Sequence, residues 1–108
     1  MKKFLALYMA PVTVMDEWNK MTKEDQKKGM DEWMEWAKAH KSDLVELGNP
    51  VGKNKRVTKE GVSDRRNEVG GYSIVQADSH EEAAKIFADN PHLKTPGTYV
   101  EVLEIKSM

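Results

Sequence analysis

The chain has 108 residues, the size of one domain with a modest core, and we expect a single domain over residues 1–108. It contains no cysteine and three histidines, which excludes disulfides and a thiolate nucleophile and argues against a structural zinc site. Seventeen basic and eighteen acidic side chains leave a net charge of -1, so the strong basic surplus typical of nucleic-acid binding is absent.

The first predicted element is a strand that begins at about Lys3. Residues 4–9 (FLALYM) are apolar at both odd and even positions, so both faces of the strand are apolar. This is typical of a strand covered on both faces and predicts a central place in the sheet. A basic start before an apolar run also occurs in secretory signals, but here the run is short and Asp16 and Glu17 follow. We therefore expect a cytoplasmic protein that does not span a membrane.

Two helical segments follow Pro11. The first is a short helix over residues 14–21, and the second is a long helix that Thr22 caps, with Asp25 three residues on. The apolar residues of the long segment fall on one face at helical spacing, which predicts packing against the sheet. They are Met30, Trp33, Met34, Ala37, Leu44 and Val45. We expect Gly48 to end this helix in a left-handed conformation.

The segment from residue 51 to 64 is polar and basic. Lys59-Glu60-Gly61 lies between Val57-Thr58 and Val62-Ser63, which predicts a tight turn between two short extended pieces.

The last third of the chain predicts strand, helix and strand. Gly70-Gly71 opens a strand over residues 72–77, and Ser79 with Glu82 forms a capping box that starts a helix at His80. Asn90-Pro91 ends that helix, since proline disfavours helical geometry in the residue before it. Residues 99–105 form the final strand.

The order β-α-β-β-α-β predicts an α+β fold, the ferredoxin-like plait, with an antiparallel sheet and both helices on one face. Strand residues such as Tyr72, Ile74 and Leu103 add more apolar surface than two helices can cover. We therefore expect the bare face to meet a second copy in a homodimer.

Four segments carry a resemblance to a known family: KKFLALYM, GNPVG, GGYSIVQADSHEEAAKIFADNPHL and VEVLEI. In these the chain resembles the YCII-related, or DGPF-type, proteins of the dimeric α+β barrel superfamily. The resemblance implies a ferredoxin-like protomer, dimerisation through the sheets, and a pocket between sheet and helices. It also implies a candidate His-Asp pair, whose carboxylate matches Asp89. The histidine of that pair is expected near the front of the long helix, where this chain has residues 30–33, MDEW.

Asp89 and His92 are an acid and an imidazole three residues apart in sequence, where the chain leaves the second predicted helix of the plait, and we take them as candidate catalytic residues. A carboxylate that accepts from an imidazole N–H orients it as a general base. The alternative is that both residues only close a helix end. His40 and Tyr8 are candidates for the edge of a ligand pocket, although a packed or interfacial role is the alternative for His40. His80 is expected to be solvated.

The long helix is rich in large side chains. Trp33 and Met34 are expected in the core, whereas Trp36 lies off the centre of the apolar face and is a candidate to cover a ligand or a partner surface. The basic residues from Lys53 to Arg66 either hold an anionic ligand or form a solvated edge.

Two classes of function remain. One is a small-molecule enzyme or binding protein that uses acid-base chemistry on a small organic acid or lactone; the other is a non-catalytic dimeric module that binds a ligand or another protein. The sequence has no phosphate loop, nucleophile elbow or metal-spacing motif, and we expect no cofactor and no metal.

Overall fold

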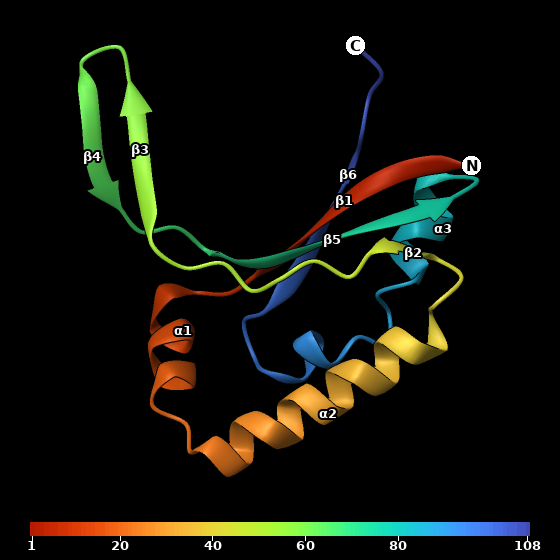
Figure 1. Ribbon diagram of the computed structural model, residues 1–108, viewed down its shortest axis with the longest axis horizontal. Helices are drawn as coiled ribbons and strands as arrows, with labels where there is room; N and C mark the ends of the chain where they lie inside the picture. The colour runs from red at the N-terminus through yellow and green to blue at the C-terminus, as the bar shows by residue number, and fades with distance from the viewer.

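A four-stranded antiparallel sheet forms the body of the protein (Figure 1). The computed structural model describes residues 1–108. The strands are β1 (Lys2–Met9), β2 (Leu44–Glu46), β5 (Val69–Ala77) and β6 (Tyr99–Glu104), in the order β2-β5-β1-β6. Every neighbouring pair is antiparallel, as the ferredoxin-like plait requires. The predicted fold class is confirmed, and β1 lies between two strands as its two-sided apolar pattern predicted.

The longest helix, α2 (Lys23–Ala39), lies beneath the sheet, and α1 (Val12–Asn19) leads into it (Figure 1). The Thr22 side chain caps α2 by accepting from the Asp25 N–H at 3.1 Å. Ser79 caps α3 (His80–Lys85) in the same way, with 3.1 Å to the Glu82 N–H. Both caps were predicted from the sequence. Each side chain satisfies a backbone N–H that the first turn of a helix leaves without a partner.

All three helices differ from their predicted bounds, and the first runs over Val12–Asn19 rather than residues 14–21. The second helix ends at Ala39 rather than before Gly48, and Leu44 leaves it to pair with Val75 in the sheet. Gly48 does have a positive φ of 79°, but it lies in the loop after β2, where a Cβ would overlap the Tyr72 carbonyl oxygen. Close approach of two backbone segments therefore requires this glycine. The third helix ends at Lys85, five residues before Asn90, and the short 3₁₀ helix η1 (Pro91–Lys94) follows.

The predicted hairpin forms, but it is not part of the main sheet. β3 (Asn54–Thr58) and β4 (Gly61–Arg65) make a separate two-stranded sheet that stands away from the body (Figure 1). The second strand of the plait is instead β2, whose residues Leu44 and Val45 had been predicted as part of the long helix.

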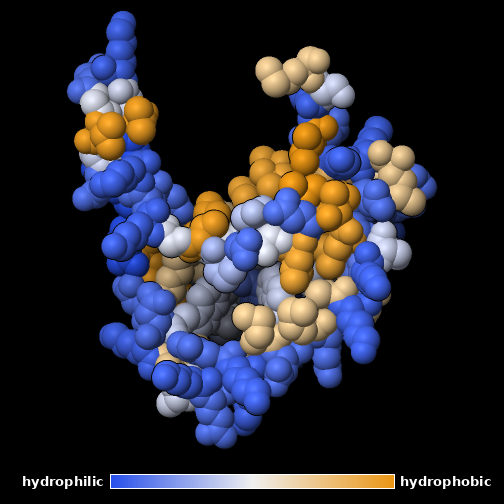
Figure 2. All heavy atoms as spheres, viewed as in Figure 1, coloured by the Kyte–Doolittle hydropathy of each residue, from blue (hydrophilic) through white to orange (hydrophobic).

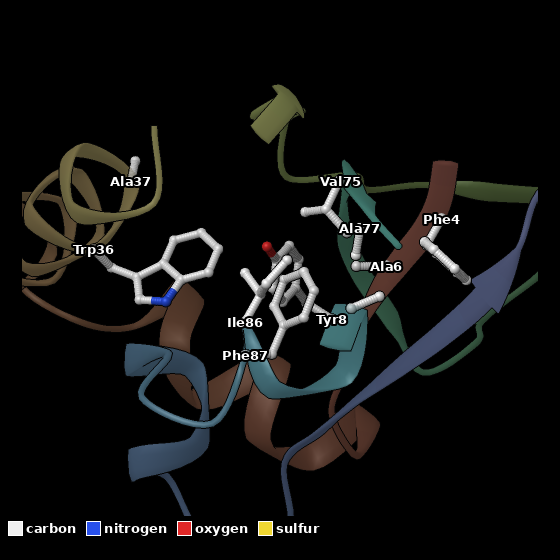
Figure 3. Packing of buried hydrophobic residues seen from close by; sticks show 10 residues of the cluster. Phe4, Ala6, Tyr8, Trp36, Ala37, Val75, Ala77, Ile86 and Phe87 are labelled. Atoms are coloured by element: carbon white, nitrogen blue, oxygen red, sulfur yellow. The ribbon is translucent and has the colours of Figure 1, made fainter. Parts of the chain in front are cut away.

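The core lies between the sheet and the helices. Phe4, Ala6 and Tyr8 point to the helical side from alternate positions of β1, and Ser73 and Val75 do so from β5. The helical side contributes a second set of buried side chains (Figure 3), namely Trp36, Ala37, Ala83, Ile86 and Phe87. Leu5 and Leu7 point to the other face, which nothing in the chain covers. No helix has the length and apolar character that crossing a bilayer requires.

Candidate functional site

A cavity of about 400 Å³ opens between α2 and the end of the sheet where β5 begins. It lies in the recess below the centre of Figure 2. Fourteen residues line it: Tyr8, Trp18, Gly29, Met30, Trp33, Met34, Leu47, Gly48, Asn49, Pro50, Gly70, Gly71, Tyr72 and His92. No lysine, arginine, aspartate or glutamate is among them.

Tyr8 reaches the cavity from the buried side of β1. Its hydroxyl lies 2.7 Å from Ser73 Oγ, and Ser73 Oγ donates to the Leu47 carbonyl at 2.5 Å. Because the single Ser73 proton is used on Leu47, the Tyr8 hydroxyl must donate to Ser73, and its oxygen keeps a free lone pair. Burial raises the pKa of Tyr8 to about 12, so the phenol is uncharged at neutral pH.

His92 reaches the same cavity from η1. The Asn90 side chain accepts from the His92 backbone N–H at 2.8 Å, which fixes the start of this turn. His92 Nε2 lies 2.8 Å from the Met9 carbonyl oxygen, and since a carbonyl only accepts, Nε2 must carry the proton. Nδ1 is therefore the basic nitrogen of the neutral ring. Burial lowers the pKa of His92, which keeps the ring neutral at pH 7.

Aromatic rings hold these two groups in place. The Tyr8 ring packs edge-on against Trp33 at 4.7 Å between centroids and against His92 at 5.6 Å. On its other side His92 lies 5.7 Å from Trp18. The cavity thus combines flat apolar walls with uncharged polar side chains, among them Tyr8 and His92, a composition that suits a small flat ligand.

The structure does not bring Asp89 and His92 together as a pair. Asp89 Oδ1 instead lies 3.1 Å from His40 Nε2 and accepts from Trp36 Nε1 at 3.1 Å. The other nitrogen of His40 lies 3.3 Å from Asp43 Oδ2. The members of this cluster do not line the cavity; they are Trp36, His40, Asp43 and Asp89. This cluster joins the end of α2 to the segment after α3, and we call it the clasp.

The remaining candidates are distributed differently from the prediction. Tyr8 lies at the cavity, whereas Trp36 is 5% exposed in the core. Trp33 and Met34, which were expected in the core, line the cavity, and Met34 is 49% exposed. His80 is exposed as expected, although its Nε2 lies 2.7 Å from the Val102 carbonyl oxygen.

A second groove of about 930 Å³ adjoins the cavity at the base of the hairpin, and Trp18, Pro50 and Gly70 line both. Two of its cations are already paired. Arg66 donates to Asp16 at 2.7 Å and holds the pKa of that carboxyl below its usual value, and Lys55 lies 2.6 Å from Asp64. No three histidine or carboxylate side chains gather as they would to hold a metal ion.

A search of curated proteins finds no match. Among solved structures the fold is similar to 5-chloro-2-hydroxyhydroquinone dehydrochlorinase (TftG) from Burkholderia phenoliruptrix in complex with 2,5-dihydroxybenzoquinone, with a TM-score of 0.51 and 15% identity. The similarity covers 94% of this chain and 91% of that one. The family model of the YCII-related domain matches residues 4–108, which confirms the resemblance found in the sequence. The chain therefore belongs to the family of proteins that carry a YCII-related domain.

Proposed function

We propose that the protein binds a small, flat, hydroxylated ring compound in the 400 Å³ cavity and transfers a proton to or from it. The observation that carries the proposal is the meeting of the Tyr8 hydroxyl and the His92 imidazole in a cavity with aromatic walls and no charged side chain.

The chemistry follows from the two hydrogen bonds that are already made. His92 Nε2 is held by the Met9 carbonyl, so Nδ1 is the atom that takes a proton, and a pKa lowered by burial keeps it unprotonated and ready at neutral pH. The free lone pair of Tyr8 accepts from a ligand hydroxyl while its own proton stays on Ser73. His92 is thus the general base, and Tyr8 orients the ring.

The cavity also indicates the charge of the ligand. A carboxylate would lose its water shell there without gaining a cationic partner, which is costly. We therefore favour an uncharged phenol or hydroquinone over the small organic acid expected from the sequence. The dehydrochlorinase with the similar fold is named for a hydroxylated aromatic ring, and from it we take the ring class and, as the reaction to be tested, the loss of chloride from that ring.

Tryptophan fluorescence tests the binding step, because Trp18 and Trp33 line the cavity. We expect hydroquinone to quench the emission saturably, and benzoate, an anion of similar size, to bind at least about tenfold more weakly. His40→Gln serves as the control variant, since His40 belongs to the clasp and does not line the cavity. Equal affinity for hydroquinone and benzoate, or no saturable quenching by either, contradicts the proposed ligand class.

Chloride release from 5-chloro-2-hydroxyhydroquinone tests the catalytic step. We expect release with the parent protein, and its loss in His92→Gln, which keeps an N–H donor for Met9 but has no basic nitrogen. Binding of the ring without chloride release in any variant favours the second candidate, a binding protein without turnover.

A further inference from the structure

The groove of about 930 Å³ beside the cavity differs from it in charge. It lies between α1 and the base of the hairpin that β3 and β4 form (Figure 1). Its charged side chains are four cations, Lys53, Lys55, Arg65 and Arg66, and one acid, Asp64. The cavity has no lysine, arginine, aspartate or glutamate. The two adjoining spaces therefore suit different chemical groups.

Two of the four cations in the groove are free to bind a ligand. Arg66 and Lys55 are held by carboxylates at 2.7 and 2.6 Å. Lys53 and Arg65 are in none of the five ion pairs of the chain. Arg65 donates from one guanidinium nitrogen to the Asp64 carbonyl oxygen at 3.0 Å, which anchors the side chain and leaves its other N–H groups for a ligand.

The two free cations lie near each other where β3 begins and β4 ends. Arg65 is the direct cross-strand partner of Asn54, the residue that follows Lys53. Asn54 is half-buried and adds its amide to the wall of the same groove. A guanidinium binds a carboxylate through two parallel N–H···O bonds, and an ammonium beside it adds a second positive charge. This group of side chains therefore suits a carboxylate.

The groove adjoins the cavity at one end, where Trp18, Pro50 and Gly70 line both. The register of β1 with β5 shifts there and leaves Gly70 without a paired residue. Since glycine has no side chain, nothing at this position projects into the passage between the two spaces. A ring in the cavity can therefore carry a substituent that extends into the groove.

The distribution of charge along the chain favours an anion at this place. Residues 53–66 contain six basic and two acidic side chains, a net charge of +4, and because the whole chain carries -1 the remainder carries -5. The groove thus lies at the one basic region of an otherwise acidic protein. Such a region attracts anions from solution and raises their local concentration.

We propose that the ligand is a hydroxylated ring with a short acidic side chain, whose ring lies in the cavity and whose carboxylate lies in the groove on Arg65 and Lys53. This rests on the proposed function, since it takes the ring site from there and names the second part of the ligand. The ring remains uncharged in the cavity, where a carboxylate has no cationic partner, and the acid group has two partners in the groove. Arg65 and Lys53 determine specificity and take no part in proton transfer.

Homogentisate, which is hydroquinone with a CH₂COO⁻ side chain, tests this ligand class. Its binding is measured by tryptophan fluorescence, because Trp18 lines both spaces. We expect the parent protein to bind homogentisate about fivefold or more tightly than hydroquinone, through charge-assisted hydrogen bonds to the acid group. The amide of homogentisate has the same shape without the charge and should bind no more tightly than hydroquinone. Added salt should weaken only homogentisate, because the two cations are exposed.

A pair of double variants locates the acid group. Lys53→Gln/Arg65→Gln should lower the affinity for homogentisate to that for hydroquinone, and unchanged hydroquinone binding shows that the variant is folded. The matched control, Arg56→Gln/Lys59→Gln, removes two positive charges from the same hairpin at positions that do not line the groove. It should leave the affinity for homogentisate within about twofold of the parent, since these cations are too distant to touch the ligand.

The outcomes separate this inference from the proposed function. Hydroquinone binding with no preference for homogentisate overturns the inference and leaves the proposed function in place. An equal loss of homogentisate affinity in the two double variants also overturns it, because net charge alone would then explain the preference. A parent protein that binds neither ring contradicts the proposed function, and the inference with it.

Discussion

Burial shifts the pKa values of Tyr8 and His92 in opposite directions and leaves both side chains uncharged. It raises the pKa of the acid, Tyr8, to about 12 and lowers the pKa of the base, His92, because in each case the charged form loses hydration. Each is also held by an oxygen of the neighbouring chain segment, Ser73 Oγ for Tyr8 and the Met9 carbonyl for His92. A site made in this way accepts and donates hydrogen bonds over a broad range of pH.

The lowered pKa of His92 predicts an acid-sensitive fold. Below its unfolded pKa of about 6.5 the unfolded chain binds a proton that the folded chain resists, so stability rises with pH up to that value and is lost as the pH falls toward the folded pKa. Urea denaturation at pH 7 and pH 5 should show a larger loss of stability for the parent than for His92→Gln, which does not titrate. An equal loss in both proteins contradicts the shift.

Tyr8→Phe removes one hydroxyl from the cavity. Ser73 still donates to Leu47 but loses the donor that it accepts from, so we expect a destabilisation of about 1 kcal/mol in thermal or urea unfolding. Hydroquinone affinity should fall about fivefold to tenfold, since the ligand hydroxyl loses its acceptor. Unchanged affinity in a stable variant would place the ligand away from Tyr8.

The sequence identified several site residues but not their partners. His92 was a candidate because Asp89 is close to it in sequence, Tyr8 was a candidate for the edge of the pocket, and both line the cavity. Asp89 was paired with His92 because they are close in sequence, whereas folding places His40, 49 positions away, against it. The sequence could not identify Trp18 and Trp33 as cavity residues. A tryptophan on an apolar helix face gives the same sequence pattern whether it fills a core or lines a cavity.

At the level of elements, local signals were reliable and boundaries that depend on tertiary contact were not. The two caps at Thr22 and Ser79 and the turn before Gly61 follow from nearby residues alone. β2 is only three residues long. Leu44 belongs to it because it pairs with Val75, and a pairing between residues this far apart in sequence cannot be predicted from the local pattern. Because β2 takes the place of the second strand in the main sheet, the hairpin of β3 and β4 is additional to the plait.

Two glycines next to the cavity should respond to alanine in opposite ways. Gly29 lies within α2, and a Cβ added there would meet no atom within 4 Å, so Gly29→Ala should stabilise the protein by about 1 kcal/mol through helix propensity. Gly48 has a positive φ, and a Cβ there would overlap the Tyr72 carbonyl, so Gly48→Ala should cost at least about 2 kcal/mol. Thermal unfolding measures both, and a shift of the same sign in the two variants contradicts the prediction.

For the whole molecule, the sheet separates two surfaces. The helical side carries the core and the cavity, and the opposite side, which holds Leu5 and Leu7, is the open face. The open face carries apolar side chains that the chain itself does not cover, among them Leu103, which is 44% exposed. Assembly and ligand binding should therefore respond to different substitutions.

Leu103→Glu tests this separation. The side chain is already exposed in the protomer, so the fold should be retained, but in a dimer the new carboxylate would be buried opposite apolar strands without a cation, which is costly. We expect a monomer in sedimentation equilibrium that still binds hydroquinone with the affinity of the parent. Met21→Glu is the control, since Met21 is 40% exposed but lies between α1 and α2, far from the open face (Figure 1), and its dimer should persist. If Leu103→Glu lost the dimer and the ligand together, the cavity would depend on the second copy, and the division between the two sides of the sheet would be wrong.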